Sequence, residues 1–409
     1  MIKHKINKTE EGNVISFLKD IIEQPSSAHD GRGIYDFVYQ YMKKEGIDPA
    51  FQSIKNPYVT YGDYSNLYVK IGHGNGLKIM LNGHLDTVVP ITGWIQDPYC
   101  GRDEDGKIYG IGSADMKGGC AAALQAAISL SRRKKVINGE LFLTFVFGEE
   151  DPFSLGADTL LREFDLKDYD LIIVPEPSPL LAVNDYCYTH KKIHQSKFPV
   201  PIVGAEGRIF FEIEFFGKPA HASHPSQGIN ALEDAARLIS QLTQFEMFEN
   251  LKMGRGHYCV LNIDGGDQTF TVPSLCKVYV NRQLTLGETE KTATNELKKI
   301  IKRLKLRSKV QIKKRFSPDP ILEYRPYLFE KSDLIDEFIQ YLPAMYRNKR
   351  CRFTTSSVGD FNVFATRTGV PTLVFGPGGG NIHAPNEYVN KQDVIDTTNY
   401  LLNFFMEVF

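Results

Sequence analysis

Acidic and imidazole side chains in this 409-residue chain recur just after short apolar runs that have the pattern of buried strands. Taken singly, each has an ordinary alternative as a turn residue or a helix N-cap. Taken together, they could hold two divalent ions, because such a pair needs about three ligands per ion and one shared carboxylate. Nitrogen and oxygen donors without thiolate suit Zn²⁺, Co²⁺ or Mn²⁺ in an open catalytic site. The candidates are His84, Asp86, Asp115, Glu149, Glu150, Glu176 and His383.

Two of these acids remain once five ligands are assigned to the two ions. Asp86 lies two residues from His84, so it can hold that imidazole through a hydrogen bond. One member of the pair Glu149 and Glu150 can act as a general base that takes a proton from the attacking water. The spacing alone leaves open which glutamate is the ligand and which is the base.

The elements around these residues alternate between helices and buried strands. The apolar periodicity predicts helices at 13–24, 32–45 and 117–133 and strands at 78–82, 141–147 and 171–174. Such alternation is typical of an α/β layer with a largely parallel sheet. Because ligands bind in the crevice at the carboxyl ends of the strands in such sheets, we expect the candidate residues to meet there.

The middle of the chain has a different pattern. It predicts strands at 208–216, 258–263, 275–283 and 309–314 and helices at 227–245 and 288–304. The order β-α-β-β-α-β is that of the ferredoxin-like split unit. After the proline-bearing stretch 317–326, the pattern predicts a helix at 332–341, a strand at 371–375 and a helix at 391–407. We therefore expect an α/β domain, 1–206 and 318–409, interrupted by an inserted α+β domain, 207–317.

Composition limits the class of protein. The chain is 42% hydrophobic and 24% charged, which is typical of soluble globular proteins. Its net charge of −1 predicts neither a nucleic acid nor a membrane surface as partner. It has no apolar run of the roughly 18–20 residues that span a bilayer, and its polar beginning does not resemble a secretory signal. Six scattered cysteines, none in a C-x-x-C pair, suit reduced thiols in a cytoplasmic protein.

Seven segments resemble the M20 metallohydrolases, a family of deacylases and peptidases. In family order they are GHLDTV (83–88), GIGSADMKGG (110–119), FGEED (147–151), PEP (175–177), GKPAHASHPSQGINA (217–231), LNIDGG with VPS (261–274) and FGPGGGNIHAPNE (375–387). The resemblance implies a mixed-sheet domain with a dinuclear metal site and an inserted lid and dimerisation domain. It also implies that the first metal ion is held by His84, Asp115 and Glu176, and the second by Asp115, Glu150 and His383. Glu149 would then be the general base, and Asp86 the residue that orients His84.

The resemblance assigns further roles to residues that contact substrate. His221, in A-H-x-x-x-P, would reach the active site of the partner chain in a homodimer and stabilise the oxyanion; otherwise it is a helix-entry residue. Asn262 and Arg282 match substrate-contacting positions, and the guanidinium fork of Arg282 suits a carboxylate. Arg282 could equally be a surface charge. Gly378 would offer a backbone N–H close to the substrate, where a side chain would obstruct.

Two features depart from the family pattern. The segment 179–205 is longer than the usual connection between the PEP motif and the lid. Within it, His190 and His194 are four residues apart, which would form a metal-binding face on a helix, but a solvated loop is the favoured interpretation. Asn281 stands where an acid is expected before Arg282, so the orientation of that arginine is open.

The reaction implied by the resemblance is hydrolysis of an amide bond at an amino acid, with zinc expected first and cobalt or manganese as alternatives. Glutamate at 176 favours deacylases and carboxypeptidases, whose small substrates carry a free carboxylate. Aspartate there is typical of aminopeptidases and dipeptidases, so a di- or tripeptidase is the alternative. The glycine clusters at 72–76 and 376–380 match no nucleotide-binding motif. A non-catalytic relative would lack a metal or base residue, and all are present.

Overall fold

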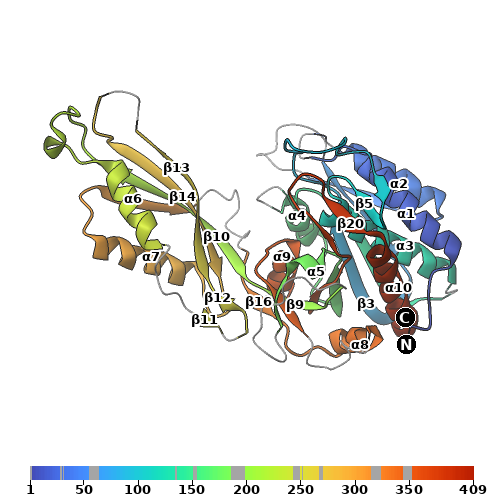
Figure 1. The fold of residues 1–409 in the computed structure, drawn as a ribbon. Helices are drawn as coiled ribbons and strands as arrows, with labels where there is room; N and C mark the ends of the chain where they lie inside the picture. The colour runs from blue at the N-terminus through green and yellow to red at the C-terminus, as the bar shows by residue number, and fades with distance from the viewer. Residues whose placement is uncertain are drawn as a thin grey trace. The chain divides into compact units, whose positions relative to one another are not determined.

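The computed structural model describes residues 2–27, 30, 32–54, 64–133, 136–150, 154–185, 199–242, 249–250, 252–266, 270–314, 324–343 and 352–409. The chain divides into two compact units (Figure 1). Unit 1 consists of Met1–Ala205 and Leu328–Phe409, and unit 2 is Glu206–Tyr327. The first expected domain boundary, 206/207, lies next to the division at 205/206. The second, 317/318, falls outside the described residues, as do His190 and His194.

Unit 1 is built on a mixed sheet with the strand order β1-β2-β6-β3-β7-β18-β9-β17-β8. Four neighbours in the middle of this order, β6, β3, β7 and β18, run parallel to one another. Most of their residues are buried, as expected where helices cover both faces of a sheet. The strands are β1 (Ala50–Ser53), β2 (Ser65–Ile71), β3 (His73–His84), β6 (Asn138–Val146), β7 (Leu171–Val174), β8 (Ala182–Asp185), β9 (Ile202–Ala205), β17 (Phe353–Thr355) and β18 (Thr372–Val374).

Helices cover both faces of this sheet (Figure 1). On one face α1 (Lys8–Ile22), α3 (Gly118–Arg133) and α10 (Lys391–Val408) pack together, and on the other α4 (Leu155–Glu163) packs against α9 (Asp360–Thr368). The remaining helices of the unit are α2 (Gly33–Lys44), α5 (Ser178–Leu181) and α8 (Asp333–Tyr341). None of the helices in the described part of the chain has the length and apolar character that a membrane span requires.

A smaller sheet in unit 1 joins two segments that are far apart in the sequence. Its order is β19-β20-β5-β4, from β4 (Arg102–Glu104), β5 (Lys107–Tyr109), β19 (Gly379–Gly380) and β20 (Tyr388–Asn390). β5 leads into the single turn η1 (Ser113–Lys117), which directly precedes α3. Since β20 pairs with β5, the segment around residue 383 is anchored beside the segment around residue 115.

Unit 2 has the predicted split topology. Its antiparallel sheet has the order β13-β14-β10-β15, and α6 and α7 connect the strands in the sequence β-α-β-β-α-β. The elements are β10 (Gly207–Phe216), η2 (Pro225–Gln227), α6 (Ala231–Leu242), β11 (Glu249–Asn250), β12 (Gly254–Arg255), β13 (His257–Gly265), β14 (Leu275–Leu284), α7 (Glu290–Leu304) and β15 (Lys309–Lys314). The strand β16 (Tyr327–Leu328) ends the insertion.

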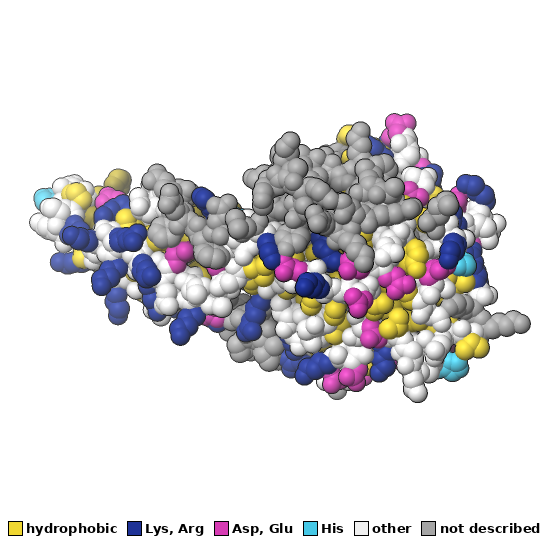
Figure 2. All heavy atoms as spheres, turned by 90° about the horizontal axis from the view of Figure 1, so that it is seen from below, with side chains coloured by type: hydrophobic (Ala, Val, Ile, Leu, Met, Phe, Trp, Pro, Cys, Tyr) yellow, Lys and Arg dark blue, Asp and Glu magenta, His cyan; other side chains and the backbone are white. Residues whose placement is uncertain are grey.

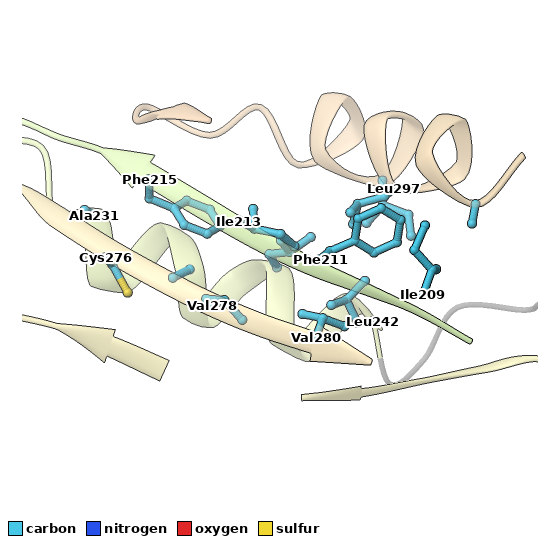
Figure 3. Close-up of a cluster of buried hydrophobic side chains, with 14 of the residues drawn as sticks. Ile209, Phe211, Ile213, Phe215, Ala231, Leu242, Cys276, Val278, Val280 and Leu297 are labelled. Carbon is cyan, nitrogen blue, oxygen red and sulfur yellow. The ribbon is translucent and has the colours of Figure 1, made fainter. Parts of the chain in front are cut away.

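The core of unit 2 lies between this sheet and its two helices. Every second residue of β10 from Ile209 to Phe215 is buried, and Leu297 of α7 packs into the same cluster (Figure 3). The opposite face of α7 is rich in lysine, and Figure 2 shows Lys and Arg side chains gathered over unit 2. The near-zero net charge of the chain therefore conceals a local basic excess. Cys100, Cys120, Cys259 and Cys276, the cysteines in the described residues, are free thiols.

Candidate dinuclear metal centre

The five residues expected to bind metal come from five segments of unit 1. His84 is the last residue of β3, Glu150 follows β6, and Glu176 follows β7. His383 lies in the loop between β19 and β20, and Asp115 lies in η1. Because β3, β6 and β7 are parallel neighbours, their carboxyl ends open onto one edge of the sheet, as the alternation of strands and acids predicts.

The candidate ligand atoms form two groups that have Asp115 in common. The first group is His84, Asp115 and Glu176, and the second is Asp115, Glu150 and His383; within each, the ligand atoms lie within 4.8 Å of one another. His84 Nε2 is 3.5 Å from the Asp115 carboxylate and 3.4 Å from Glu176. His383 Nε2 is 3.0 Å from Glu150 and 3.4 Å from Asp115. Asp115 therefore offers one oxygen to each group, which suits a shared ligand.

The donor set fits two divalent cations. The imidazole of His84 is 1% exposed, and its Nε2 makes no hydrogen bond within the described residues. Three carboxylates lie 3.4–3.8 Å from that nitrogen, farther than a normal hydrogen bond. Like-charged carboxylates so close together disfavour one another's ionised form unless a cation lies between them. A cation bound here would take Nε2 of His84 as a ligand and would offset the negative charge of the acids.

The pKa values of the site reflect this crowding of charge. Burial, with Asp115 nearby, raises the pKa of Glu176 to about 8 and also raises that of Glu150. Interaction with Asp115 and Glu150 raises the pKa of His383 to about 11. Burial opposes protonation of His84, but Asp115 and Glu176 outweigh it and raise the pKa of that imidazole well above its ordinary value. These acids thus favour positive charge beside them, either on the two imidazoles or on metal ions.

Glu149 lies beside the first group but belongs to neither. Its Oε2 is 3.8 Å from His84 Nε2, and its other oxygen packs so closely on Gly359 that a Cβ there would lie 2.5 Å away. Burial, reinforced by the nearby Glu176, raises the pKa of Glu149 well above its ordinary value despite the opposing effect of His84. A buried carboxyl that is not needed as a ligand and binds protons readily has the properties of a general acid–base group.

Asp86 is placed differently from the expectation that its acid side chain holds the imidazole. Nδ1 of His84 is 3.0 Å from the backbone carbonyl of Asp86 but 3.9 Å from its carboxylate. The carboxylate instead accepts the backbone N–H of Glu150 at 3.1 Å and lies 3.5 Å from the hydroxyl of Tyr35. Asp86 therefore contacts His84 through its backbone, while its side chain fixes the start of the loop that carries Glu150.

Arg282 is neither an exposed charge nor an open ligand for substrate. It is fully buried in unit 2, where its guanidinium donates to Glu288, to Glu296 and to the backbone carbonyl of Gln283. The centroid of the Tyr258 ring lies 5.0 Å from the guanidinium carbon. The acids that orient this arginine are Glu288, two residues before α7 begins, and Glu296 within α7, rather than a residue at position 281. In this conformation the guanidinium is not available to a substrate carboxylate.

Gly378 is likewise engaged within unit 1. Its N–H donates to Asp393 Oδ2 at 3.2 Å, and a Cβ at this position would lie 2.7 Å from the same oxygen. The position requires glycine for packing, and its N–H is not directed to a substrate. In unit 2, Asn262 and His221 are both exposed, and Nδ1 of His221 accepts the N–H of Ser223 at 3.1 Å.

The chain matches the sequence model of Peptidase family M20/M25/M40 over residues 80–407. The chain belongs to this family. All five candidate metal ligands and Glu149 lie within the matched range. Members of the family are hydrolases, both peptidases and deacylases, that act on amide bonds, so this chain is a hydrolase of that type.

Curated relatives within the family include deacylases. A succinyl-diaminopimelate desuccinylase from a Nitratiruptor species is 26% identical over 402 residues, covering 93% of this chain and 96% of the relative. An acetylornithine deacetylase from Buchnera aphidicola subsp. Acyrthosiphon pisum is 26% identical over 362 residues, covering 85% of each.

Solved structures share the fold over almost the whole chain. A tripeptidase from Staphylococcus aureus subsp. aureus Mu50 has a TM-score of 0.75 and 19% identity, and covers 99% of both chains. A dinuclear metal-binding M20 peptidase from Bacillus subtilis has a TM-score of 0.68 and 14% identity, and covers 98% of this chain and 99% of its own. At these identities the likeness concerns the fold.

Proposed function

We propose that this hydrolase removes the acyl group from a small N-acyl amino acid, or releases a C-terminal residue, from a substrate with a free carboxylate. The observation that carries the proposal is the group of His84, Asp115 and Glu176, in which the third residue is glutamate as in deacylases and carboxypeptidases. The desuccinylase and deacetylase among the curated relatives support the same interpretation. We propose zinc as the metal, since the donors are imidazole and carboxylate.

In this proposal the five ligands of the two groups hold the metal ions, which supply Lewis acidity for activating water and polarising the amide carbonyl. Glu149 is free to act as the base because it lies outside both groups. Its carboxylate takes a proton from the attacking water and its carboxyl then gives the proton to the leaving nitrogen. The Asp86 side chain keeps the Glu149–Glu150 loop in place through its bond to the Glu150 N–H.

We further propose that the chain acts as a homodimer in which unit 2 supplies His221 to the partner's site. The edge strand β13 of unit 2 exposes Leu261 and Ile263, which are 49% and 43% accessible. Phe270, 85% accessible, lies in the loop between β13 and β14. That loop pairs with the segment carrying His221, through a bridge to Thr271. Exposed apolar residues beside the histidine favour contact with another chain at this end of unit 2.

The test is a hydrolysis panel read by mass spectrometry. Metal-stripped protein, with and without added Zn²⁺ or Co²⁺, is offered N-acetyl and N-succinyl amino acids, peptides blocked at the amino terminus and unblocked di- and tripeptides. The Glu149→Gln protein, loaded identically, controls for contaminating hydrolases. Metal-dependent cleavage of the acylated or blocked substrates is expected. Cleavage of unblocked peptides alone would replace this proposal with a di- or tripeptidase.

Light scattering of the purified protein tests the homodimer. A dimer that becomes monomeric on Leu261→Lys and Ile263→Lys substitution is expected. A wild-type monomer that is fully active would exclude supply of His221 by a partner chain.

A further inference from the structure

The carboxylate of Glu387 binds the backbone of the segment that carries Asp115. Glu387 is 2% exposed and lies in unit 1, four residues after His383. Its Oε2 accepts the N–H of Gly112 at 2.9 Å, and its Oε1 accepts the N–H groups of Ala114 and Asp115 at 2.8 and 3.0 Å. One side chain thus satisfies three backbone donors within a four-residue stretch.

The N–H groups of residues 112, 114 and 115 bond to this side chain rather than to backbone carbonyls of a regular helix or strand. Asp115 has φ −119° and ψ 94°, which is outside the helical region although the residue lies in η1, the turn that precedes α3. Backbone N–H groups that converge in such a turn form a pocket for acceptor oxygens, and here the two carboxyl oxygens of Glu387 occupy it. Without it, these three donors, two of them in buried bonds, would need other acceptors, so the conformation at residues 112–115 depends on this carboxyl group.

The segment 383–387 therefore contacts both the side chain and the backbone of Asp115. His383 Nε2 lies 3.4 Å from the Asp115 carboxylate, and Glu387 accepts the Asp115 N–H. The backbone carbonyl of Glu387 also accepts the N–H of Gly110 at 3.0 Å, and the pairing of β20 with β5 continues from that bond. The loop that supplies a ligand to the second group thereby fixes the residue common to both.

We propose that Glu387 is a positioning residue for the shared ligand Asp115, so that the affinity of both metal ions depends on a carboxylate that touches neither. The inference rests on the proposed role of Asp115 as the common ligand. A merely structural acid would stabilise the fold and leave the metal affinity of the folded protein unchanged. The two roles are separated by measuring metal binding and folding on the same variants.

The variants are Glu387→Gln and Glu387→Ala, with Asp234→Asn as the matched control. Gln keeps the size of the side chain and one acceptor oxygen, but it presents an amide N–H₂ to the remaining donor. Asp234 is also buried and accepts two backbone N–H groups, those of Arg307 and Ser308, but it lies in unit 2. Substituting it by asparagine removes the charge and weakens bonds of the same kind without touching the metal groups.

Metal-stripped proteins are titrated with Co²⁺, followed by visible absorption and calorimetry, and their thermal unfolding is recorded without metal. We expect Co²⁺ affinity to fall 10–100-fold in Glu387→Gln, as for other groups that orient metal ligands, and further in Glu387→Ala. Asp234→Asn should lower the unfolding temperature and leave Co²⁺ affinity unchanged. Wild-type affinity and absorption in both folded Glu387 variants would overturn the proposal.

A double-mutant cycle with Asp115→Asn tests whether Glu387 acts through Asp115. In that background, Glu387→Gln should weaken Co²⁺ binding less than it does in the wild-type protein, because the residue it positions has already lost its charge. An equal loss in both backgrounds would overturn the proposal. If the wild-type protein binds two Co²⁺ ions yet cleaves nothing in the hydrolysis panel, the proposed function fails while these binding measurements still decide the role of Glu387.

Discussion

The buried ion pair between Arg282 and Glu288 makes a quantitative prediction about unit 2. The guanidinium side chain is 0% exposed and that of Glu288 is 7% exposed. Glu288 also accepts the N–H of Thr285 at 2.9 Å through its other oxygen. Glu288→Gln retains the shape of the side chain but removes the charge that compensates a fully buried cation.

We expect this substitution to lower the free energy of unfolding substantially. Removing one partner of a buried pair costs about 3–5 kcal/mol, because the other charge stays buried without compensation. Glu296, 3.4 Å from the guanidinium and 18% exposed, keeps part of the attraction, so about 3 kcal/mol is expected, the low end of that range. The matched control is Glu290→Gln, also at the start of α7. Its carboxylate pairs with Lys314 where both side chains are partly exposed, so about 0.2–1 kcal/mol is expected.

Urea unfolding followed by far-UV circular dichroism measures both losses. The only tryptophan, Trp94, belongs to unit 1, so its fluorescence reports that unit separately. If Glu288→Gln is no more destabilising than Glu290→Gln, the pair does not carry the buried charge as argued. Arg282→Met provides the functional comparison. A raised KM with unchanged stability would mean that Arg282 binds the substrate carboxylate after all.

Three further predictions concern the candidate metal site, a buried acid of unit 1 and the hydrophobic core of unit 2. Glu149→Gln should lower kcat about 10²–10⁴-fold with two metal ions still bound by elemental analysis, whereas Glu150→Gln should lose metal; the opposite pattern would exchange their roles. Burial raises the pKa of Asp393 to about 6, so the folded state binds this proton more tightly and the contribution to stability falls as pH rises from about 4 to 6. Relative to wild type, Asp393→Asn should therefore gain up to roughly 3 kcal/mol between pH 4 and 7 in urea unfolding, and a constant difference would contradict this. Leu297→Ala should cost about 2–5 kcal/mol in the unit 2 core of Figure 3, and a loss below about 1 kcal/mol would mean that the cluster repacks.

The sequence predicted those parts of the site that follow from local patterns. Apolar runs ending in acids and imidazoles placed His84, Glu150 and Glu176 at strand ends, because a buried strand excludes charge and its carboxyl end opens to the crevice. Helix and strand periodicity likewise located β14, α7 and β15 of unit 2 to within two residues. The family resemblance, confirmed by the family match, carried the pairing of ligands into groups.

The parts that the sequence could not predict depend on contacts between distant backbone and side-chain atoms. Nothing near Glu387 shows that it accepts N–H groups from residue 112 onward, because backbone donors carry no sequence signal. Arg282 was expected to meet substrate, but its partners Glu288 and Glu296 reach it only when α7 packs on the sheet. The hydrogen bond from the Gly378 N–H to Asp393 likewise joins a backbone donor to a side chain elsewhere in the chain, so no sequence pattern predicts it. The only indication of a role for Glu387 in the sequence was that it is an acid at the end of the segment 375–387 and is not itself a candidate metal ligand.

The interleaved order of the large sheet has a consequence for how the protein is made. β18 lies between β7 and β9, yet it is synthesised roughly 200 residues after β7, which takes about 10–40 s at 5–20 residues per second. During that time one edge of β7 lacks its partner, while the contiguous strands and helices of unit 2 can already assemble. His383 leaves the ribosome later still. The nascent chain therefore cannot complete the second candidate metal group, and we expect no hydrolase activity, before His383 has emerged.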